Sequence, residues 1–152
     1  MVRLTDLDED LGGFLRDWET PEVPGSAWVT PPPAAGRRVA LVSSAGLKLP
    51  GDLPFSEGSA DYRVIPAERC NEVVMDHLSV SHDRTGFQQD LNVVFPLAHL
   101  QTLAEEGEIG SVAEFHYSFM GATDPNEMES EARKLAGVMK AEGVNTVLFA
   151  PV

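Results

Sequence analysis

The sequence predicts an α/β protein built on an open, mostly parallel sheet. The apolar run VALV at 39–42 has the composition of a strand that is buried on both faces, and VNTVLFAPV at 144–152 predicts a second buried strand. From Asp124 to the end of the second run, the pattern is helix, glycine, short turn and strand, which is half of a parallel crossover unit. These observations favour a sheet of the Rossmann or flavodoxin kind with flanking helices.

Composition limits the function classes. A chain of 152 residues with 43% hydrophobic and 23% charged residues is typical of one globular domain. Its formal net charge of -13 repels phosphate groups, so nucleic acid and anionic membranes are poor partners. Acidic residues near the amino terminus argue against a signal peptide, and the lone Cys70 fits a reducing compartment. We therefore expect a cytoplasmic protein.

The amino-terminal region differs from the rest of the chain. Residues 4–18 have apolar positions at roughly helical spacing, broken by Gly12 and Gly13, which predicts one short amphipathic helix. The following stretch, ETPEVPGSAWVTPPPAAGRR, is rich in proline and predicts an extended arm. We divide the chain into an arm with its helix at 1–36 and an α/β domain at 37–152.

The first half of the domain is expected to hold three strands. The first lies within 37–47 around VALV, and a long loop over 43–55 follows because glycine and proline occupy the positions where a helix would start. DYRVIP at 61–66 predicts the second strand. NEVVMDHLSV at 71–80, with partly alternating apolar residues, predicts the third.

The second half is expected to alternate helices and strands. Pro96 suits the first position of a helix that continues through LAHLQTLAEEG until Gly107 ends it. FHYSFMG at 115–121 predicts a short strand. Asp124 has the place of a helix cap, and Gly143 ends the helix that follows. Ligands of open α/β sheets collect at the carboxyl ends of the strands, so we expect the site among the loops there.

Several diagnostic motifs do not occur. The sequence contains no GxGxxG, GxxxxGK[ST], CxxC, HExxH or GxSxG pattern. The usual dinucleotide, nucleoside triphosphate, dithiol, zinc-protease and α/β-hydrolase sites therefore have no support. The sequence identifies no cofactor.

Polar candidates gather in SHDRTGFQQDLNVVFP, at 81–96. Such a loop could assemble an acid, a base and hydrogen-bond donors, but composition alone favours a solvated connector capped by Asp90 or Asn92. A metal site is the weaker interpretation because no diagnostic spacing links its possible ligands, which are His77, His82, Asp83, Asp90 and His116.

His116 with Tyr117, and Cys70, are further candidates for functional residues, and each also has a purely structural interpretation. His116 and Tyr117 come near the end of a predicted strand, which could place them at a pocket rim, although a histidine bonded within the core fits equally well. Cys70 follows Arg69, a cation that could lower a thiol pKa, but lone cysteines are more often inert.

Beyond these patterns, long blocks of the sequence resemble one family. VALVSSAGLKLPGDLPF, ADYRVIP, LSVSHDRTGFQQDLNVVFPLAHLQTLAEEGEIGSVAEFHYSFMG and GVNTVLFAPV look like the selenoprotein B component of the glycine, sarcosine and betaine reductases, and like the related D-proline reductase subunit. The similarity runs from about Ser26 to the last residue. Its most specific parts are S-H-D, the later D-x-N-V-V-F-P-L, and H-Y-S-F-M-G.

The resemblance implies an α/β reductase subunit that acts on small amino acids or N-methylated amines. In that family a selenocysteine or cysteine attacks the carbon bearing the nitrogen, and the amine leaves. We expect catalytic roles for His82, Asp83, Asp90 and His116. We expect substrate binding by Ser81, Arg84, Asn92, Tyr117 and Ser44. The resemblance thereby turns the polar run from a connector into a candidate pocket wall.

The family pattern also places the nucleophile soon after the strand equivalent to VLFAPV, where this sequence stops at Val152, and its only thiol, Cys70, lies elsewhere. Three hypotheses follow: an enzyme that uses the polar loop on a small metabolite, a subunit whose second reductase chain supplies the nucleophile, or an accessory protein that has lost catalysis. We order them in that sequence. We also expect a homodimer, since the arm could serve as a docking element.

Overall fold

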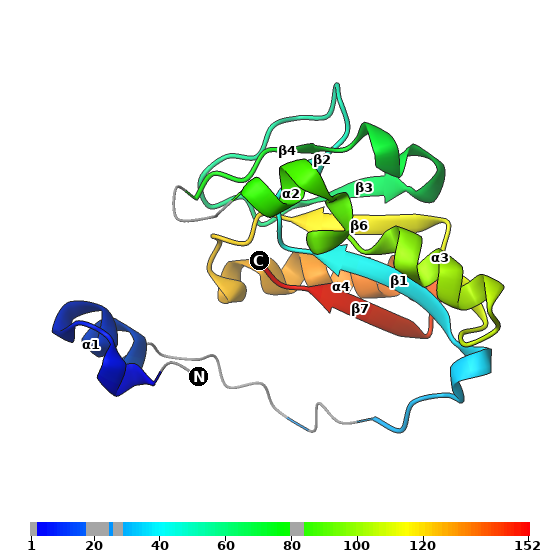
Figure 1. The fold of residues 1–152 in the computed structure, drawn as a ribbon, viewed down its shortest axis with the longest axis horizontal. Coiled ribbons are helices and arrows are strands. Elements are labelled where there is room, and N and C mark those ends of the chain that lie inside the picture. The colour runs from blue at the N-terminus through cyan, green and yellow to red at the C-terminus, as the bar shows by residue number, and fades with distance from the viewer. Residues whose placement is uncertain (1–2, 18–24, 26–28, 80–83) are drawn as a thin grey trace.

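A computed structural model of the chain describes residues 3–17, 25, 29–79 and 84–152 (Figure 1). A short 3-10 turn at Leu4–Asp6 precedes helix α1, Glu9–Asp17, so the predicted amino-terminal helix is confirmed. Leu11 and Leu15 on this helix remain exposed. Much of the proline-rich arm lies outside the described residues, and its described end holds a 3-10 turn at Ala34–Gly36.

The centre of the fold is a mostly parallel sheet, as predicted. Strand β1, Arg38–Ser43, pairs in parallel with β7, Thr146–Ala150, along one side. Its other side pairs in parallel with β5, Ser111–Val112, and then with β6, Phe115–Phe119. Strand β3, Tyr62–Pro66, pairs antiparallel with β6 at the edge. The finer Rossmann or flavodoxin assignment stays a prediction.

Helices cover the two faces of this sheet. Helix α4, Pro125–Ala141, covers one face, and helix α3, Leu97–Glu105, covers the other. Because side chains of a strand alternate between faces, β1 sends Val39 and Leu41 toward α3, and Ala40 and Val42 toward α4. All four are buried, which explains why VALV is apolar throughout.

The residues that begin and end α4 are those predicted from the sequence, whereas Pro96 at the start of α3 lies one position earlier than expected. The carboxylate of Asp124 accepts a hydrogen bond from the amide of Asn126 at 2.8 Å and caps α4. Gly143 follows this helix at φ 76°, a conformation that favours glycine. Pro96 was expected as the first helical residue of α3, but it lies at the cap, one position earlier. Its fixed φ suits either position.

The third predicted strand is mostly wrong. Within its described part, 71–79, only β4, Val74–Met75, is a strand, and it pairs antiparallel with β2, Leu47–Lys48, in a separate two-stranded sheet. The preceding residues, Ala67–Glu72, form 3-10 turns directly after Pro66. Strand β2 also interrupts the stretch that was expected to be a long loop, so two apolar pieces far apart in the sequence pair with each other instead of joining the main sheet.

A close backbone approach fixes this small sheet against the main one. Gly46 precedes β2 at φ 63°, and a Cβ atom there would lie 2.9 Å from the Cα of His77. The amide of Gly46 donates to the carbonyl of Phe119 at 2.9 Å, and its carbonyl accepts from the amide of Asp76 at 2.8 Å. Glycine is required here because any side chain would push the two segments apart.

Candidate functional site

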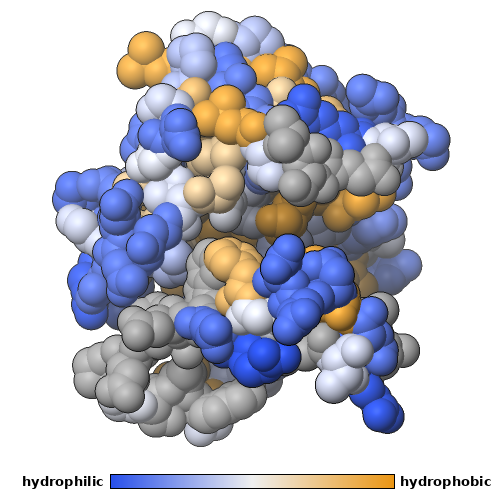
Figure 2. All heavy atoms as spheres, turned by 90° about the vertical axis from the view of Figure 1, so that its left-hand side faces the viewer, coloured by the Kyte–Doolittle hydropathy of each residue, from blue (hydrophilic) through white to orange (hydrophobic). Residues whose placement is uncertain are grey.

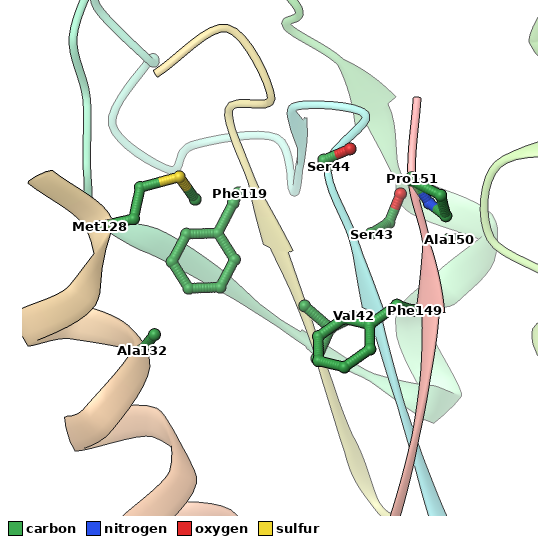
Figure 3. Close-up of a pocket in the computed structure, with 9 residues that line it drawn as sticks. All are labelled: Val42, Ser43, Ser44, Phe119, Met128, Ala132, Phe149, Ala150 and Pro151. Carbon is green, nitrogen blue, oxygen red and sulfur yellow. The ribbon is translucent and has the colours of Figure 1, made fainter. Parts of the chain in front are cut away.

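The carboxyl ends of β1, β6 and β7 frame a pocket against the first turns of α4 (Figure 3). This place was predicted from the general behaviour of open α/β sheets. The pocket has a volume of about 220 Å³ and an almost entirely apolar surface. Its walls are Val42, Ser43, Ser44, Phe119, Met128, Ala132, Phe149, Ala150 and Pro151. We refer to it as the strand-end pocket.

Aromatic and sulfur-containing side chains dominate its walls. In Figure 3, Phe119 from β6 and Met128 from α4 lie together on one side, and Phe149 from β7 lies on the other beside Val42. Phe149 is 70% exposed, so the pocket opens toward solvent along β7. Figure 2 views the molecule from the side to which the parallel strands point, and exposed apolar side chains lie there among hydrophilic ones.

Ser44 supplies the polar rim of the strand-end pocket. Its hydroxyl accepts a hydrogen bond from the amide of Val152 at 2.8 Å. Its carbonyl accepts from the amide of Gly121 at 2.9 Å, and a Cβ atom on Gly121 would lie 2.7 Å from that oxygen. The loops after β1 and β6 therefore approach each other closely. The hydroxyl of Ser43 turns to the α3 face, where it donates to the carbonyl of Val94 at 2.8 Å.

His116 lies on the α3 face and does not line the strand-end pocket. It is fully buried, and its Nδ1 accepts a hydrogen bond from the amide of Leu41 at 3.0 Å. The Phe95 ring meets the imidazole edge to face, with 5.9 Å between ring centres. Burial lowers the pKa of His116 to about 4, because desolvation disfavours the charged form. The imidazole is therefore neutral at pH 7.

The second ring nitrogen of His116, Nε2, is not used in the hydrogen bond to Leu41. With Nδ1 acting as an acceptor, the proton belongs on Nε2, and that atom is buried without a hydrogen-bond partner among the described residues. A catalytic role would need the core around Phe95 to open. The catalytic role of His116 stays a prediction.

Tyr117 points to the opposite face of the sheet. Its ring packs with the α4 side of the core and meets the Tyr62 ring edge to face at 5.7 Å. Its hydroxyl donates to Glu142 at 3.3 Å, beyond the end of α4. Burial, together with the Glu142 carboxylate, raises the pKa of Tyr117 to about 12. His116 and Tyr117 thus lie on different faces, and the predicted binding role of Tyr117 is untested.

The structure describes only part of the polar run. Ser81, His82 and Asp83 lie outside the described residues, and their expected roles remain predictions. Arg84 donates a hydrogen bond to the carbonyl of His77 at 2.5 Å. Leu78 and Ser79, just before the run, line a second hollow of about 560 Å³ with Glu57, Gly58, Met120 and Ala122.

Asp90 and Asn92 interact with each other. The Asp90 carboxylate accepts from both the backbone amide and the side-chain amide of Asn92, each at 2.9 Å. These bonds hold the pKa of Asp90 below its usual value and cap a 3-10 turn at Leu91–Val93. A short helix α2, Thr85–Gln89, precedes that turn. The contacts of Asp90 and Asn92 are those of a capped connector, and their chemical roles stay untested.

Cys70 is far from the strand-end pocket along the sheet. It lies in the turns of Ala67–Glu72, and the amide of Ala67 donates to the carbonyl of Glu114 at 2.8 Å. Because β3 runs antiparallel to β6, its end lies beside Phe115, at the amino end of β6. The pocket lies at the other end of that strand.

The apolar pocket residues were not singled out from the sequence. The motifs that identify catalytic residues consist of polar side chains, whereas Phe119, Met128 and Phe149 contribute apolar surface. The loops after FHYSFM and VLFAPV did point to this place, because both follow strands of a parallel sheet. Within the described part of the chain, no three histidine, cysteine or acidic side chains gather where they could hold a metal ion.

Comparison with known protein families identifies the family of this chain. The family model for glycine/sarcosine/betaine reductase selenoprotein B matches residues 32–151. The chain belongs to this family. The match includes every strand of the sheet, both covering helices and all walls of the strand-end pocket.

Two curated relatives carry subunit names. The chain is 33% identical over 133 residues to the D-proline reductase subunit gamma of Acetoanaerobium sticklandii, covering 80% of this chain and 54% of the relative. It is 31% identical over 118 residues to the betaine reductase complex component B subunit beta of Peptoclostridium acidaminophilum, covering 73% and 27%. The chain thus spans about half of one relative and about a quarter of the other. No solved structure matches significantly.

Both relatives are named as subunits of reductases. The predicted family is therefore confirmed. In addition, none of the described helices combines the length and apolar character needed to cross a membrane.

Proposed function

We propose that this chain is the substrate-holding part of a reductase complex, and that the strand-end pocket receives the amine portion of a small amino acid or N-methylated amine. The observation that carries the proposal is the pocket itself. It lies at the carboxyl ends of three strands, and it offers apolar and aromatic surface next to the Ser44 hydroxyl.

The chemistry of the walls fits such a ligand. Carbon groups attached to an amine nitrogen pack well against Met128 and the two phenylalanine rings, and aromatic faces attract quaternary or protonated amines. The relatives are named for D-proline and betaine, which are a cyclic amine and a quaternary amine. None of the described residues that line the pocket carries a carboxylate, so the aromatic rings would stabilise the positive charge of the amine.

The reactive sulfur or selenium would come from outside these residues. Cys70 is the only cysteine of the sequence and lies at the opposite end of the sheet from the pocket. A thiolate or selenolate that attacks the carbon bearing the nitrogen must therefore be supplied by polypeptide of the complex other than these 152 residues. This favours the second of our three sequence hypotheses over an enzyme that relies on Asp90 and His116 alone.

Binding measurements with a filled pocket test the proposal. Ala132→Phe places a ring into the pocket from α4, whereas Ala141→Phe places the same ring at the exposed end of that helix. We expect calorimetry to detect binding of betaine or D-proline by the parent and by Ala141→Phe. Binding by Ala132→Phe should be at least about ten-fold weaker. Equal affinity in both variants, or no binding to the parent of betaine, sarcosine, glycine or D-proline, would contradict the proposal.

A further inference from the structure

The outer edge of β7 is unusually open to pairing. Among the described residues β7 pairs with β1 alone, and its sequence TVLFA contains neither charge nor proline. Leu148 and Phe149 are 39% and 70% exposed. Another edge strand, β3, contains Arg63 and ends in Pro66, features that discourage pairing with another chain, and the edge strand β5 is only two residues long. An edge without such features is a site for adding a strand.

The pairing with β1 shows which backbone groups face outward. The amide of Ser44 donates to the carbonyl of Ala150 at 3.1 Å, so the carbonyl of Ala150 points toward β1. Backbone groups of successive residues alternate in direction along a strand. The amides and carbonyls of Thr146 and Leu148 therefore also point toward β1, and those of Val147 and Phe149 point away from it.

We propose that β7 pairs antiparallel with β7 of a second copy of this chain, with the two-fold axis at Leu148. In that register Val147 lies opposite Phe149 of the second copy, and the two residues exchange both of their backbone hydrogen bonds. Phe149 and Val147 of the second copy form the same two bonds. Every backbone amide and carbonyl of Val147 and Phe149 that points away from β1 is then hydrogen-bonded. Pro151, which has no amide hydrogen, stays outside the paired region.

The side chains of the two copies complement each other in this register. Val147 faces α4 and lines a hollow of about 200 Å³, whose other walls are Ala136, Met139, Lys140, Val144, Asn145 and Thr146. Phe149 of the second copy lies opposite Val147 on the same face, so its ring enters that hollow. On the other face Leu148 meets Leu148 of the second copy. Two-fold symmetry makes the contact between Val147 and Phe149 occur twice, whereas the Leu148 pair lies on the axis and occurs once.

The pairing also encloses the strand-end pocket. Phe149 forms one wall of that pocket, and its outer side is open in the single chain. In the pair, Val147 and α4 of the second copy cover that outer side. The exposed apolar surface of β7 thereby becomes the centre of an interface, where such residues contribute most of the binding free energy.

Cysteine cross-linking tests the register. In a Cys70→Ser background, Leu148→Cys should form a disulfide between copies under mild oxidation. Opposite Cα atoms of a non-hydrogen-bonded antiparallel pair lie about 4.5 Å apart, within the range that a disulfide spans. Val74→Cys in the same background is the matched control, because Val74 is 41% exposed on the separate small sheet. Equal cross-linking of the two variants would overturn the proposal.

Sedimentation tests the pair itself. The parent should be dimeric at micromolar concentration, and added salt should strengthen the dimer because each copy carries a formal charge of -13. Phe149→Lys should raise the dimer dissociation constant about 30-fold or more, whereas Val74→Lys should leave it unchanged. A monomeric parent at high micromolar concentration, including one that binds only a different subunit, would overturn the proposal. No ligand is used, so this result is independent of the proposed function.

Discussion

The backbone amide of Leu41 donates to Nδ1 of His116, at 3.0 Å, inside the sheet. A parallel ladder would normally offer a backbone carbonyl at this place. Here the neighbouring strand is interrupted, since β5 ends at Val112 and β6 starts at Phe115. A side chain thus completes the hydrogen bonding of β1, which explains why a histidine is fully buried in an apolar layer.

This arrangement predicts that the protein loses stability in acid. The pKa of His116 is about 4 in the fold and about 6.5 in the unfolded chain. Between these values the unfolded chain binds a proton and the fold does not, so stability is full above pH 6.5 and falls toward pH 4. The loss attributable to His116 should be about 3 kcal/mol by pH 4.

Replacing His116 by asparagine separates titration from hydrogen bonding. In His116→Asn the amide oxygen can accept from Leu41 but does not titrate. Urea unfolding between pH 4 and pH 7 should show a flatter pH dependence for this variant than for the parent. His99→Asn, the same substitution at an exposed histidine on α3, is measured beside it as the matched variant outside the core. An unaltered slope in His116→Asn would refute the assignment.

Gly46 is predicted to tolerate no side chain. Gly46→Ala combines a left-handed backbone, φ 63°, with a contact of 2.9 Å to the backbone of His77. Gly51→Ala meets the same kind of backbone penalty at φ 93°, but nothing lies within 4 Å of its Cβ atom. We expect a loss of about 1 kcal/mol at Gly51 and at least about 2 kcal/mol more at Gly46. Chemical denaturation measures both, and equal losses would rule out the close approach.

Asp124 is predicted to stabilise the start of α4. Asp124→Ala removes the acceptor for the amide of Asn126 and should cost about 1 kcal/mol of unfolding free energy. Glu129→Ala, which removes an exposed ion pair with Arg133 on the same helix, should cost less than about 0.5 kcal/mol. A cap variant no less stable than the ion-pair variant would show that the cap contributes little.

Cys70 is predicted to be dispensable. Cys70→Ser should change neither ligand affinity nor oligomeric state, because the residue lies at the end of the sheet opposite the pocket and away from β7. A stability loss of about 1 kcal/mol or less is expected from a partly buried side chain at the rim of the core. Loss of binding in this variant, measured by calorimetry, would instead reveal a role for the thiol.

The long periodic elements could be predicted from the sequence. VALV lies within β1, VNTVLFAPV contains β7, and the Asp124 cap correctly marks the start of α4, because these features depend on local pattern. The expected burial of VNTVLFAPV was wrong, since β7 lies at an edge of the sheet and exposes Leu148 and Phe149. Residues 71–80 were misjudged. Their partly alternating apolar pattern suits a strand, but the turns after Pro66 and the contact of Gly46 with His77 divert the chain into a separate sheet. Such tertiary effects leave no local pattern.

The sequence indicated the loops at the carboxyl ends of the strands, where the strand-end pocket lies, but it placed the expected catalytic residues mainly in the polar run at 81–96, whose described part does not line that pocket. Of the expected binding residues that the structure describes, only Ser44 lines the strand-end pocket. His116 and Tyr117 are adjacent in sequence, and the alternation of a strand sends them to opposite faces. Motifs of polar residues do not identify Phe149. Its ring becomes part of the pocket wall only because β7 pairs with β1 and leaves the ring exposed.

The position of β7 also affects when the pocket can form during synthesis. Arg38 at the start of β1 bonds to Asn145, which is 107 residues later in the chain. A nascent chain therefore holds β1 without its β7 neighbour until nearly all of the domain has left the ribosome. Contacts so distant in sequence close slowly. While β7 is still inside the ribosome, the nascent chain lacks the wall that Phe149 and Ala150 contribute, so the strand-end pocket should form only after β7 emerges.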